Sequence, residues 1–282
     1  MMTERRRCPP APPADFSADL PTIQLRANPH AWVRVFWKSR RPLTFAKSRH
    51  GNRFDPLAAP WDKTRVLYAG TTLEVAIAEA LLRWHGEILP GESVLLSKSG
   101  DLQHRGVARF VPTRELTLID ASGLRLAAFE EIVTAVLERS ENREWKDRPK
   151  PIADDIFQCG AEEYPETQRW ASWFRSQAPS ADGVVWVSRQ YNLGKCLVLF
   201  ADRCERQLKL DGKVVPLYGR PQSAERQLVD RMLGELGWAW NRSSRPARLA
   251  FDEFAMELLQ SGQQGINLSR GFATYDPISK GA

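Results

Sequence analysis

The chain has 282 residues, of which 43% are hydrophobic, so it can bury a core as one large domain or two modest ones. The 40 Lys and Arg residues outnumber the 34 Asp and Glu residues, and the net charge of +6 favours anionic partners such as nucleotides, phosphate or nucleic acid. The 4 cysteines are scattered without a C-x-x-C pair, which argues against a zinc site or a disulfide framework. Because no secretory signal and no run of 18 apolar residues occurs, we expect a cytoplasmic protein without a membrane span.

The first third of the chain contains an arm, a strand and a loop. Residues 1–28 are rich in proline and charge, which is typical of a flexible arm. Residues 31–37, AWVRVFW, alternate as a strand does, and Arg34 shares a face with two aromatic residues. The following segment is interpreted as a loop that closes in the turn GNRFDP, residues 51–56.

A strand and a buried helix follow this loop. Residues 65–70, RVLYAG, predict the strand, and the next residues, TTLE, fit a capping box in which Thr71 accepts from the helix amides while Glu74 reaches back. The helix is predicted over 72–84. It is apolar on nearly all sides and carries one acid, Glu79, so we expect a carboxylate in buried surroundings.

The remaining elements indicate an α+β protein. Further strands are predicted in SVLLS, LTLID, DGVVWVSR and KCLVLFADR, a hairpin at Asp211-Gly212 in LKLDGKVVPL, and helices over 122–139, 164–177, 221–236 and 251–260. Strands outnumber long helices, which favours a mixed, largely antiparallel sheet over a doubly wound fold. Neither G-x-G-x-x-G nor G-x-x-x-x-G-K-[ST] follows a strand, so the usual nucleotide-binding motifs are absent.

Five residues could carry chemistry, and each also has a simpler interpretation: Arg34, Arg53, Tyr68, Glu79 and Ser188. Glu79 could pair with Arg83 one turn later, and Arg53 could pair with Asp55 to hold its turn. Arg34 could be an outward strand residue, Tyr68 a core aromatic, and Ser188 an ordinary residue at a strand end. Taken singly, none of the five is informative. Their order along the chain is what suggests a site.

The sequence resembles the RES domain family, bacterial toxins that degrade NAD and are paired with a helix-turn-helix antitoxin. The resemblance rests on VRVFW, GNRFDP, VLYAGTTLEVAIAEAL, YPETQRWASWF and DGVVWVSRQYNLGKCLVLFADR, which span about 31–204. It implies a domain over 29–217, with 218–282 as a helical C-terminal extension of unknown role. It also implies an ADP-ribosyltransferase-like fold, in which the sheet is split around an NAD cleft. The sequence departs from the family in being longer and in reading Asn-Arg-Phe-Asp where many members have Gly-Arg-Trp-Asn.

The resemblance implies a role for each candidate residue. Arg53, Glu79 and Ser188 fall on the arginine, glutamate and serine for which the family is named. Arg34 and Tyr68 fall on further positions that the family uses, and Arg189 is a candidate to hold phosphate. The implied activity is cleavage of the nicotinamide–ribose bond of NAD, by inorganic phosphate or by water, with NAD as substrate and with neither a cofactor nor a metal required. The implied partners are an antitoxin, through which nucleic acid could be contacted, and a second copy in a homodimer.

Two other functions compete with this one. ADP-ribosyl transfer to a macromolecule would break the same bond, but transferases usually add a [QE]-x-E pair, which has no counterpart here. A nucleic-acid-binding module is suggested by six arginines near Trp238 and Trp240: Arg220, Arg226, Arg231, Arg242, Arg245 and Arg248. A solvated helix face with two core tryptophans explains the same pattern.

Overall fold

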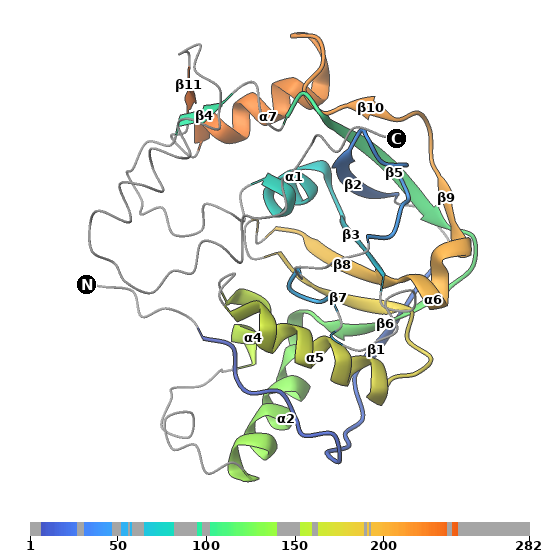
Figure 1. Ribbon diagram of the computed structural model, residues 1–282, viewed down its shortest axis with the longest axis vertical. Helices are drawn as coiled ribbons and strands as arrows, with labels where there is room; N and C mark the ends of the chain where they lie inside the picture. The colour runs from blue at the N-terminus through green and yellow to red at the C-terminus, as the bar shows by residue number, and fades with distance from the viewer. Residues whose placement is uncertain are drawn as a thin grey trace, which may run out of the picture.

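The computed structural model describes residues 7–26, 31–46, 52–55, 57, 65–81, 95–97, 102–139, 153–159, 163–188, 191, 193–235 and 239–241. The strands are β1 Thr22–Leu25, β2 Trp32–Trp37, β3 Val66–Gly70, β4 Leu95–Ser97, β5 Arg105–Pro112, β6 Leu116–Ala121, β7 Gly183–Val187, β8 Lys195–Phe200, β9 Leu208–Leu210, β10 Val215–Pro216 and β11 Ala239–Asn241. The helices are α1 Leu73–Leu81, η2 Gly123–Arg125, α2 Leu126–Arg139, α4 Asp154–Gln158, α5 Tyr164–Gln177, α6 Ala201–Cys204, η4 Glu205–Gln207 and α7 Ala224–Glu235. Figure 1 shows their arrangement.

Nine strands of the described chain form one mixed sheet in the order β1-β6-β7-β8-β3-β2-β5-β10, with β9 also paired to β5. The β6–β7 pairing is parallel, whereas the other pairings in this sheet are antiparallel. β4 and β11 form a separate parallel pair. The predicted fold class, α+β with a mixed and largely antiparallel sheet, is confirmed. Within the described residues, no helix is long and apolar enough to cross a membrane.

Two consecutive strands, β5 and β6, lie far apart in the strand order, yet only three residues connect them. The sheet must therefore curl to bring these two strands near each other. The face inside the curl is filled by apolar side chains that include Trp32 of β2, Phe110 of β5, Leu118 of β6 and Leu197 of β8. The pairing is narrowest between β2 and β3, whose register in the described residues is the single pair Val33 and Gly70. This is the place where α1 leaves the sheet.

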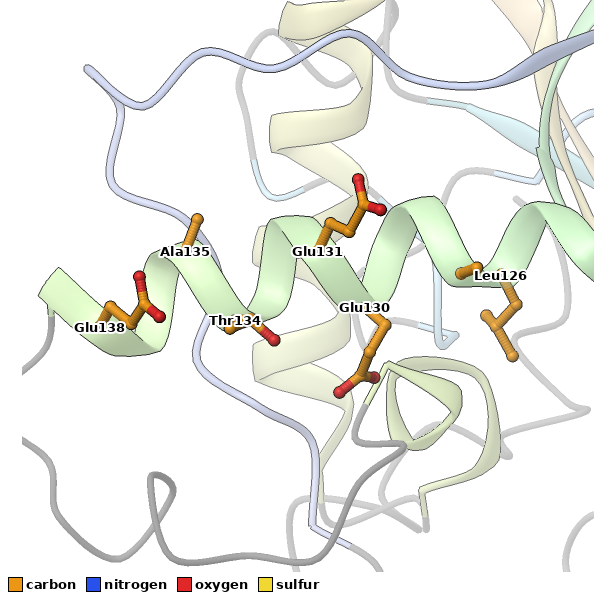
Figure 2. A pocket seen from close by; sticks show the side chains of 7 residues that line it. Leu126, Glu130, Glu131, Thr134, Ala135 and Glu138 are labelled. Carbon is orange, nitrogen blue, oxygen red and sulfur yellow. The ribbon is translucent and has the colours of Figure 1, made fainter.

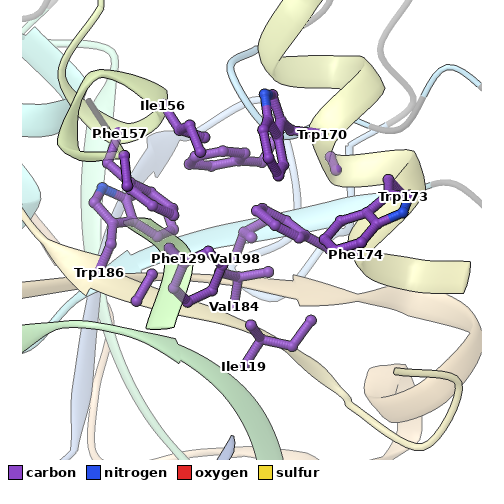
Figure 3. Close-up of a cluster of buried hydrophobic side chains, with 14 of the residues drawn as sticks. Ile119, Phe129, Ile156, Phe157, Trp170, Trp173, Phe174, Val184, Trp186 and Val198 are labelled. Carbon is purple, nitrogen blue, oxygen red and sulfur yellow. The ribbon is translucent and has the colours of Figure 1, made fainter. Parts of the chain in front are cut away.

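Helices cover the outer face of the curled sheet in two groups. The helices α2, α4 and α5 pack on the half made by β6, β7 and β8, where the core is rich in aromatic rings (Figure 3). Phe129 of α2, Phe157 of α4 and Phe174 of α5 meet there with centroids 5.6–6.4 Å apart. The helices α1 and α7 pack on β2 and β5 through a second cluster that includes Val33, Val107 and Met232.

The N-terminal segment is not a loose arm over its described part, residues 7–26. Trp170 and Trp173 of α5 donate their indole N–H groups to the carbonyls of Pro9 and Phe16, at 2.9 and 3.1 Å. Phe16 is buried, and β1 completes the edge of the sheet by pairing with β6. The prolines that suggested flexibility therefore allow an extended segment to lie across a helix, where tryptophans satisfy its carbonyls.

The hairpin predicted at Asp211-Gly212 does not form. The strands β9 and β10 on either side of this turn both pair with β5, next to Phe110–Pro112 and to Gly106–Val107. Gly212 has a φ of 82°, so the dipeptide does turn the chain, but it makes an interruption between two strands in line. Both segments pair with the open edge of β5 and not with each other.

Candidate functional site

Glu79 and Ser188 form the centre of the candidate site, because their side chains are hydrogen-bonded to each other. The hydroxyl of Ser188 donates to Oε1 of Glu79 at 2.8 Å. Glu79 is half-buried on α1, whose residues Val75–Ala78 are buried beneath it. The alternative partner, Arg83, lies outside the described residues, so the proposed pairing within the helix is not addressed.

Ser188 is fully buried just after β7 and is not an ordinary strand-end serine. Its hydroxyl also accepts from the amide of Tyr191 at 3.1 Å, and its own amide donates to the carbonyl of Gly194 at 2.9 Å. A Cβ on Gly194 would stand 2.2 Å from Cγ2 of Val75, so a glycine is required where the strand connection approaches α1. The hydroxyl is therefore fixed with its proton toward Glu79.

The start of α1 is fastened to β8 by two threonines with different tasks. Thr72, and not Thr71 as predicted, caps the helix: its hydroxyl accepts from the amide of Val75 at 3.3 Å. The Thr71 hydroxyl instead accepts from the amide of Lys195 at 3.0 Å and donates to the carbonyl of the same residue at 3.3 Å. This clamp sets the position of α1, and hence of Glu79, relative to the strand beside Ser188.

Arg53 reaches the same region from the turn at 52–55. Its guanidinium donates to the carbonyls of Phe157 and, at 2.8 Å, Cys159, and lies 5.7 Å from the centre of the Tyr164 ring. Burial lowers the pKa of this guanidinium, but the nearby Cys159, Tyr164 and Glu79 side chains together raise it above its ordinary value. Arg53 is therefore a partly buried, permanent cation whose field acts on Glu79.

The turn that carries Arg53 is held from both sides by polar side chains, and sequence reasoning missed those on one side. On one side, Thr167 of α5 donates to the carbonyl of Arg53 at 2.5 Å, and Gln168 donates to that of Asn52 at 3.1 Å. Both are buried on the helix that YPETQRWASWF had predicted. Thr167 lies three residues before Trp170, on the inward face of that helix, and a polar residue at such a position is the signal that could have found it.

Tyr68 holds the other side of the turn. Its hydroxyl accepts from the amide of Phe54 at 2.9 Å and donates to Oδ1 of Asp55 at 3.1 Å. The other carboxylate oxygen of Asp55 accepts from the amide of Asn52 at 2.6 Å. The ring of Tyr68 is half-buried and lies edge-on to Trp186, with centroids 6.5 Å apart. Tyr68 is thus a core aromatic with its hydroxyl satisfied, and its stacking on nicotinamide stays a prediction.

Arg34 lies on the other face of the sheet. Val33 pairs with Gly70, so Val33 shares a face with Tyr68, and its neighbour Arg34 points the opposite way. Its guanidinium donates to the carbonyl of Thr44 at 2.8 Å. Burial, and to a lesser degree Arg40, lowers its pKa to about 10. The structure does not bring Arg34 into contact with the Glu79 group, and Arg189 lies outside the described residues.

Cys196 is a further residue of the site that sequence reasoning missed. It pairs with Trp186 on β7 and with Gly70 on β3, so its side chain lies on the face that α1 covers. The pKa of its thiol is raised well above the ordinary value, chiefly by burial and then by the charge of Glu79. Its place between apolar neighbours in KCLVLF hides this from the sequence.

A hollow of about 570 Å³ lies elsewhere, beside α2 (Figure 2). None of the sequence-predicted site residues lines it, and its lining comes from a single helix: Leu126, Ala127, Glu130, Glu131, Thr134, Ala135 and Glu138. In the part of the chain that the structure describes, no three His, Cys, Asp or Glu side chains gather where they could hold a metal ion. We therefore place the candidate site at Glu79, whose carboxylate accepts from Ser188 and lies in the field of the Arg53 cation.

No curated protein matches the chain. Among solved structures, the chain is similar to one from the M. tuberculosis MbcT-MbcA toxin-antitoxin complex, with 17% sequence identity and a TM-score of 0.43, covering 77% of this chain and 91% of that one. Among protein families, the RES domain matches residues 26–217. Because that match spans more than half of its length, the chain belongs to the RES domain family.

Proposed function

We propose that this RES domain protein cleaves the nicotinamide–ribose bond of NAD, with Glu79 as the group that stabilises the transition state. The observation that carries the proposal is the hydrogen bond of 2.8 Å from Ser188 to Glu79, in the field of the Arg53 cation. It joins two of the three residues to which the family resemblance assigns roles, and the third, Arg53, acts on Glu79 through its charge. Ser188 is 109 residues from Glu79 along the chain, so sequence proximity does not explain their meeting.

The chemistry of NAD suits a site with one fixed carboxylate. An ordinary glycosidase needs a second carboxyl group to protonate a poor leaving group. Nicotinamide in NAD is already cationic and leaves as a neutral molecule, so it needs no proton. What develops in the transition state is positive charge on the ribose, and a carboxylate held in place by surrounding donors stabilises that charge without reorganising.

The other residues then have supporting roles. Ser188 orients the carboxylate and hydrogen-bonds the nicotinamide amide or a ribose hydroxyl when NAD is bound. Arg53 supplies positive potential toward the pyrophosphate while its carbonyl partners at Phe157 and Cys159 keep it in place. Arg34 and Arg189 are proposed to contact phosphate groups, and Tyr68 to pack beside nicotinamide. The acceptor of the ribosyl group is inorganic phosphate or water.

The test compares Glu79→Gln with Glu74→Gln in the purified protein incubated with NAD. Both substitutions neutralise a carboxylate on α1, but Glu74 faces Arg231 at 3.8 Å and not Ser188. We expect Glu79→Gln to slow NAD loss by about 100-fold or more, the scale seen when a transition-state electrostatic contact is removed, and Glu74→Gln to leave it unchanged. Equal rates in the wild type and Glu79→Gln would refute the assignment.

Product analysis separates the reaction types. Incubation with inorganic phosphate should yield a phosphorylated ADP-ribose if the enzyme is a phosphorylase, whereas free ADP-ribose with and without phosphate would indicate hydrolysis. Transfer to a macromolecule, the competing activity, would instead leave label from NAD on protein or nucleic acid. Each outcome names a different acceptor for the same bond cleavage.

Partners are proposed on the same basis. An enzyme that consumes NAD needs restraint in the cell, and we propose a helix-turn-helix antitoxin as the restraining partner and a homodimer as the assembly. The contacts of two described arginines toward the C-terminal end argue against direct nucleic-acid binding. Arg226 stacks on Tyr218 at 4.3 Å and pairs with Asp230 at 3.6 Å, and Arg231 lies near Glu74. These contacts favour a solvated helix face, and Arg242, Arg245 and Arg248 lie outside the described residues.

A further inference from the structure

Five polar side chains along one stripe of α5 are hydrogen-bonded to the main chain of the N-terminal segment. They are spaced by three or four residues, so they lie on one side of the helix. We call the segment that they bind, residues 8–18, the strap. Glu163, Glu166 and Gln177 accept from the amides of Cys8, Ala11 and Ala18 at 3.4, 2.5 and 3.3 Å, and Trp170 and Trp173 donate to the carbonyls of Pro9 and Phe16 at 2.9 and 3.1 Å.

The strap has few main-chain donors in its first half, and the stripe accepts from both of them. Residues 8–13 read CPPAPP, and proline has no N–H, so only Cys8 and Ala11 have an amide to donate. Glu163 accepts from the first and Glu166 from the second. Prolines favour an extended helix of three residues per turn, which places these two amides on the same side. Carboxylates matched to both donors, beside two tryptophans, are typical of a site for an extended, proline-rich main chain.

The first turns of α5 contact the strap on one side and the turn that carries Arg53 on another. The ring of Tyr164 lies 5.7 Å from the Arg53 guanidinium, and Thr167 donates to the Arg53 carbonyl at 2.5 Å. These residues alternate along the chain with Glu163 and Glu166, which bind the strap. A displacement of this part of α5 would therefore disturb both the strap and the position of Arg53.

We propose that α5 forms a binding site for an extended, proline-rich peptide main chain, that the strap is its ligand within the same chain, and that the docked strap holds α5 where Thr167 positions the Arg53 turn. Phe16 anchors the strap: it is 5% exposed, and its ring centroid lies 6.1 Å from that of Trp173. The effect on the reaction rests on the proposed function, whereas the docking itself does not.

Hydrogen exchange in the full-length protein tests the docking independently of any activity. Ala11→Pro removes one N–H from the strap and keeps its proline-rich character, so Glu166 loses its donor. We expect the amide of Ala18, at the other end of the strap, to exchange about tenfold faster or more, because the strap has lost a hydrogen bond to a charged group and detaches more often. An unchanged rate at Ala18 would overturn the docking.

A second proline in the strap controls for the substitution itself. Ala14 lies in the turn that the Phe16 amide closes on the Pro13 carbonyl at 3.0 Å, at a position where proline is favoured. Ala14→Pro should therefore leave the exchange rate at Ala18 as it is in the wild type. A rate raised as much as in Ala11→Pro would show that recognition of the main chain is not the cause, and would refute the proposed binding site.

The helix side of the contact has its own matched pair of variants. Glu166 also pairs with Arg169 at 2.7 Å. Both Glu166→Ala and Arg169→Ala break this ion pair, but only Glu166→Ala removes the acceptor of the Ala11 amide. Glu166→Ala should speed exchange at Ala18 as Ala11→Pro does, and Arg169→Ala should not. Similar rates in these two variants would assign the effect to the ion pair and contradict the binding site.

A double-mutant cycle tests whether the docked strap positions Arg53. Ala11→Pro should lower kcat for NAD cleavage by about threefold to tenfold, because a displaced turn misplaces its cation, whereas Ala14→Pro should not. In a Thr167→Val background, which lacks the donor to the Arg53 carbonyl, Ala11→Pro should cause no further loss, and a Thr167→Ser background should keep its effect. Additive losses in Thr167→Val would refute the positioning role. A wild-type protein that leaves NAD intact would refute the proposed function, while the exchange rates would still decide the docking.

Discussion

Removal of the Tyr68 hydroxyl should destabilise the protein by about 2 kcal/mol although the ring remains. In Tyr68→Phe, the amide of Phe54 loses its acceptor at a residue that is 0% exposed. An unsatisfied buried group costs about 1–3 kcal/mol. Asp55 also loses a donor at 3.1 Å, but it keeps the amide of Asn52, so its share is smaller. Because phenylalanine fills the same space, no cavity adds to the loss.

Tyr218→Phe provides the matched control. Its hydroxyl also donates to a carboxylate, that of Asp230, at 3.1 Å, but this contact is exposed. Loss of such a bond should change the free energy of unfolding by less than about 0.5 kcal/mol.

The assay is equilibrium unfolding in urea, read from the midpoint with the slope held in common. Thermal melting of a chain of this size should show a shift of about 4–8 °C for Tyr68→Phe. If Tyr68→Phe loses no more stability than Tyr218→Phe, the hydroxyl does not hold the turn that carries Arg53, and the explanation of how that turn is positioned is wrong.

Two further predictions concern buried ionisable groups. Burial, more than any neighbouring charge, raises the pKa of Cys204 from 9.0 to about 12, so its neutral form stabilises the fold fully below pH 9 and progressively less as the pH rises toward 12. The free energy of unfolding should fall by about 1 kcal/mol per such thiol between pH 9 and 10. Cys204→Ala should reduce this slope in urea titrations at each pH, and an unchanged slope would contradict the assignment. Arg34 is a partly buried cation with a lowered pKa, and its guanidinium donates to the carbonyl of Thr44. Arg34→Met should change the free energy of unfolding by less than about 1 kcal/mol and, under the proposed phosphate contact, slow NAD cleavage. A large loss of stability with full activity would show a structural role.

Much of the sheet and most helices could be predicted because their patterns are local. The strands at 66–70 and 183–187 and the helix at 164–177 occur where alternation or helical periodicity indicates them. The strand at 105–112 was missed because arginine, glycine and proline interrupt its apolar residues, and it forms through pairing with β2 on one side and β9 and β10 on the other. Pairing with distant strands makes residues 105–112 a strand, and no local sequence pattern indicates it.

Some residues of the candidate site could likewise be predicted from the sequence, and others could not. Arg53, Glu79 and Ser188 were predicted from the order of their motifs, and the structure brings them together. The threonine that caps α1 could not be chosen from the sequence, since Thr71 and Thr72 are adjacent and equally suited. The choice is made by Lys195, 124 residues away, which binds the hydroxyl of Thr71. Residues whose task is to hold other residues are identified by contacts and not by their own type.

The cation and the carboxylate of the site differ in how they are held, and this difference bears on their roles. The Arg53 guanidinium is bound by two backbone carbonyls, which cannot move away without disturbing α4 and the chain after it. The Glu79 carboxylate is held by the side-chain hydroxyl of Ser188, whose hydrogen can turn toward another acceptor at little cost. A group that must meet substrate has to exchange its partners, whereas a group that supplies a fixed field does not. This difference agrees with the proposed roles, in which Glu79 meets the ribose and Arg53 sets the potential around it.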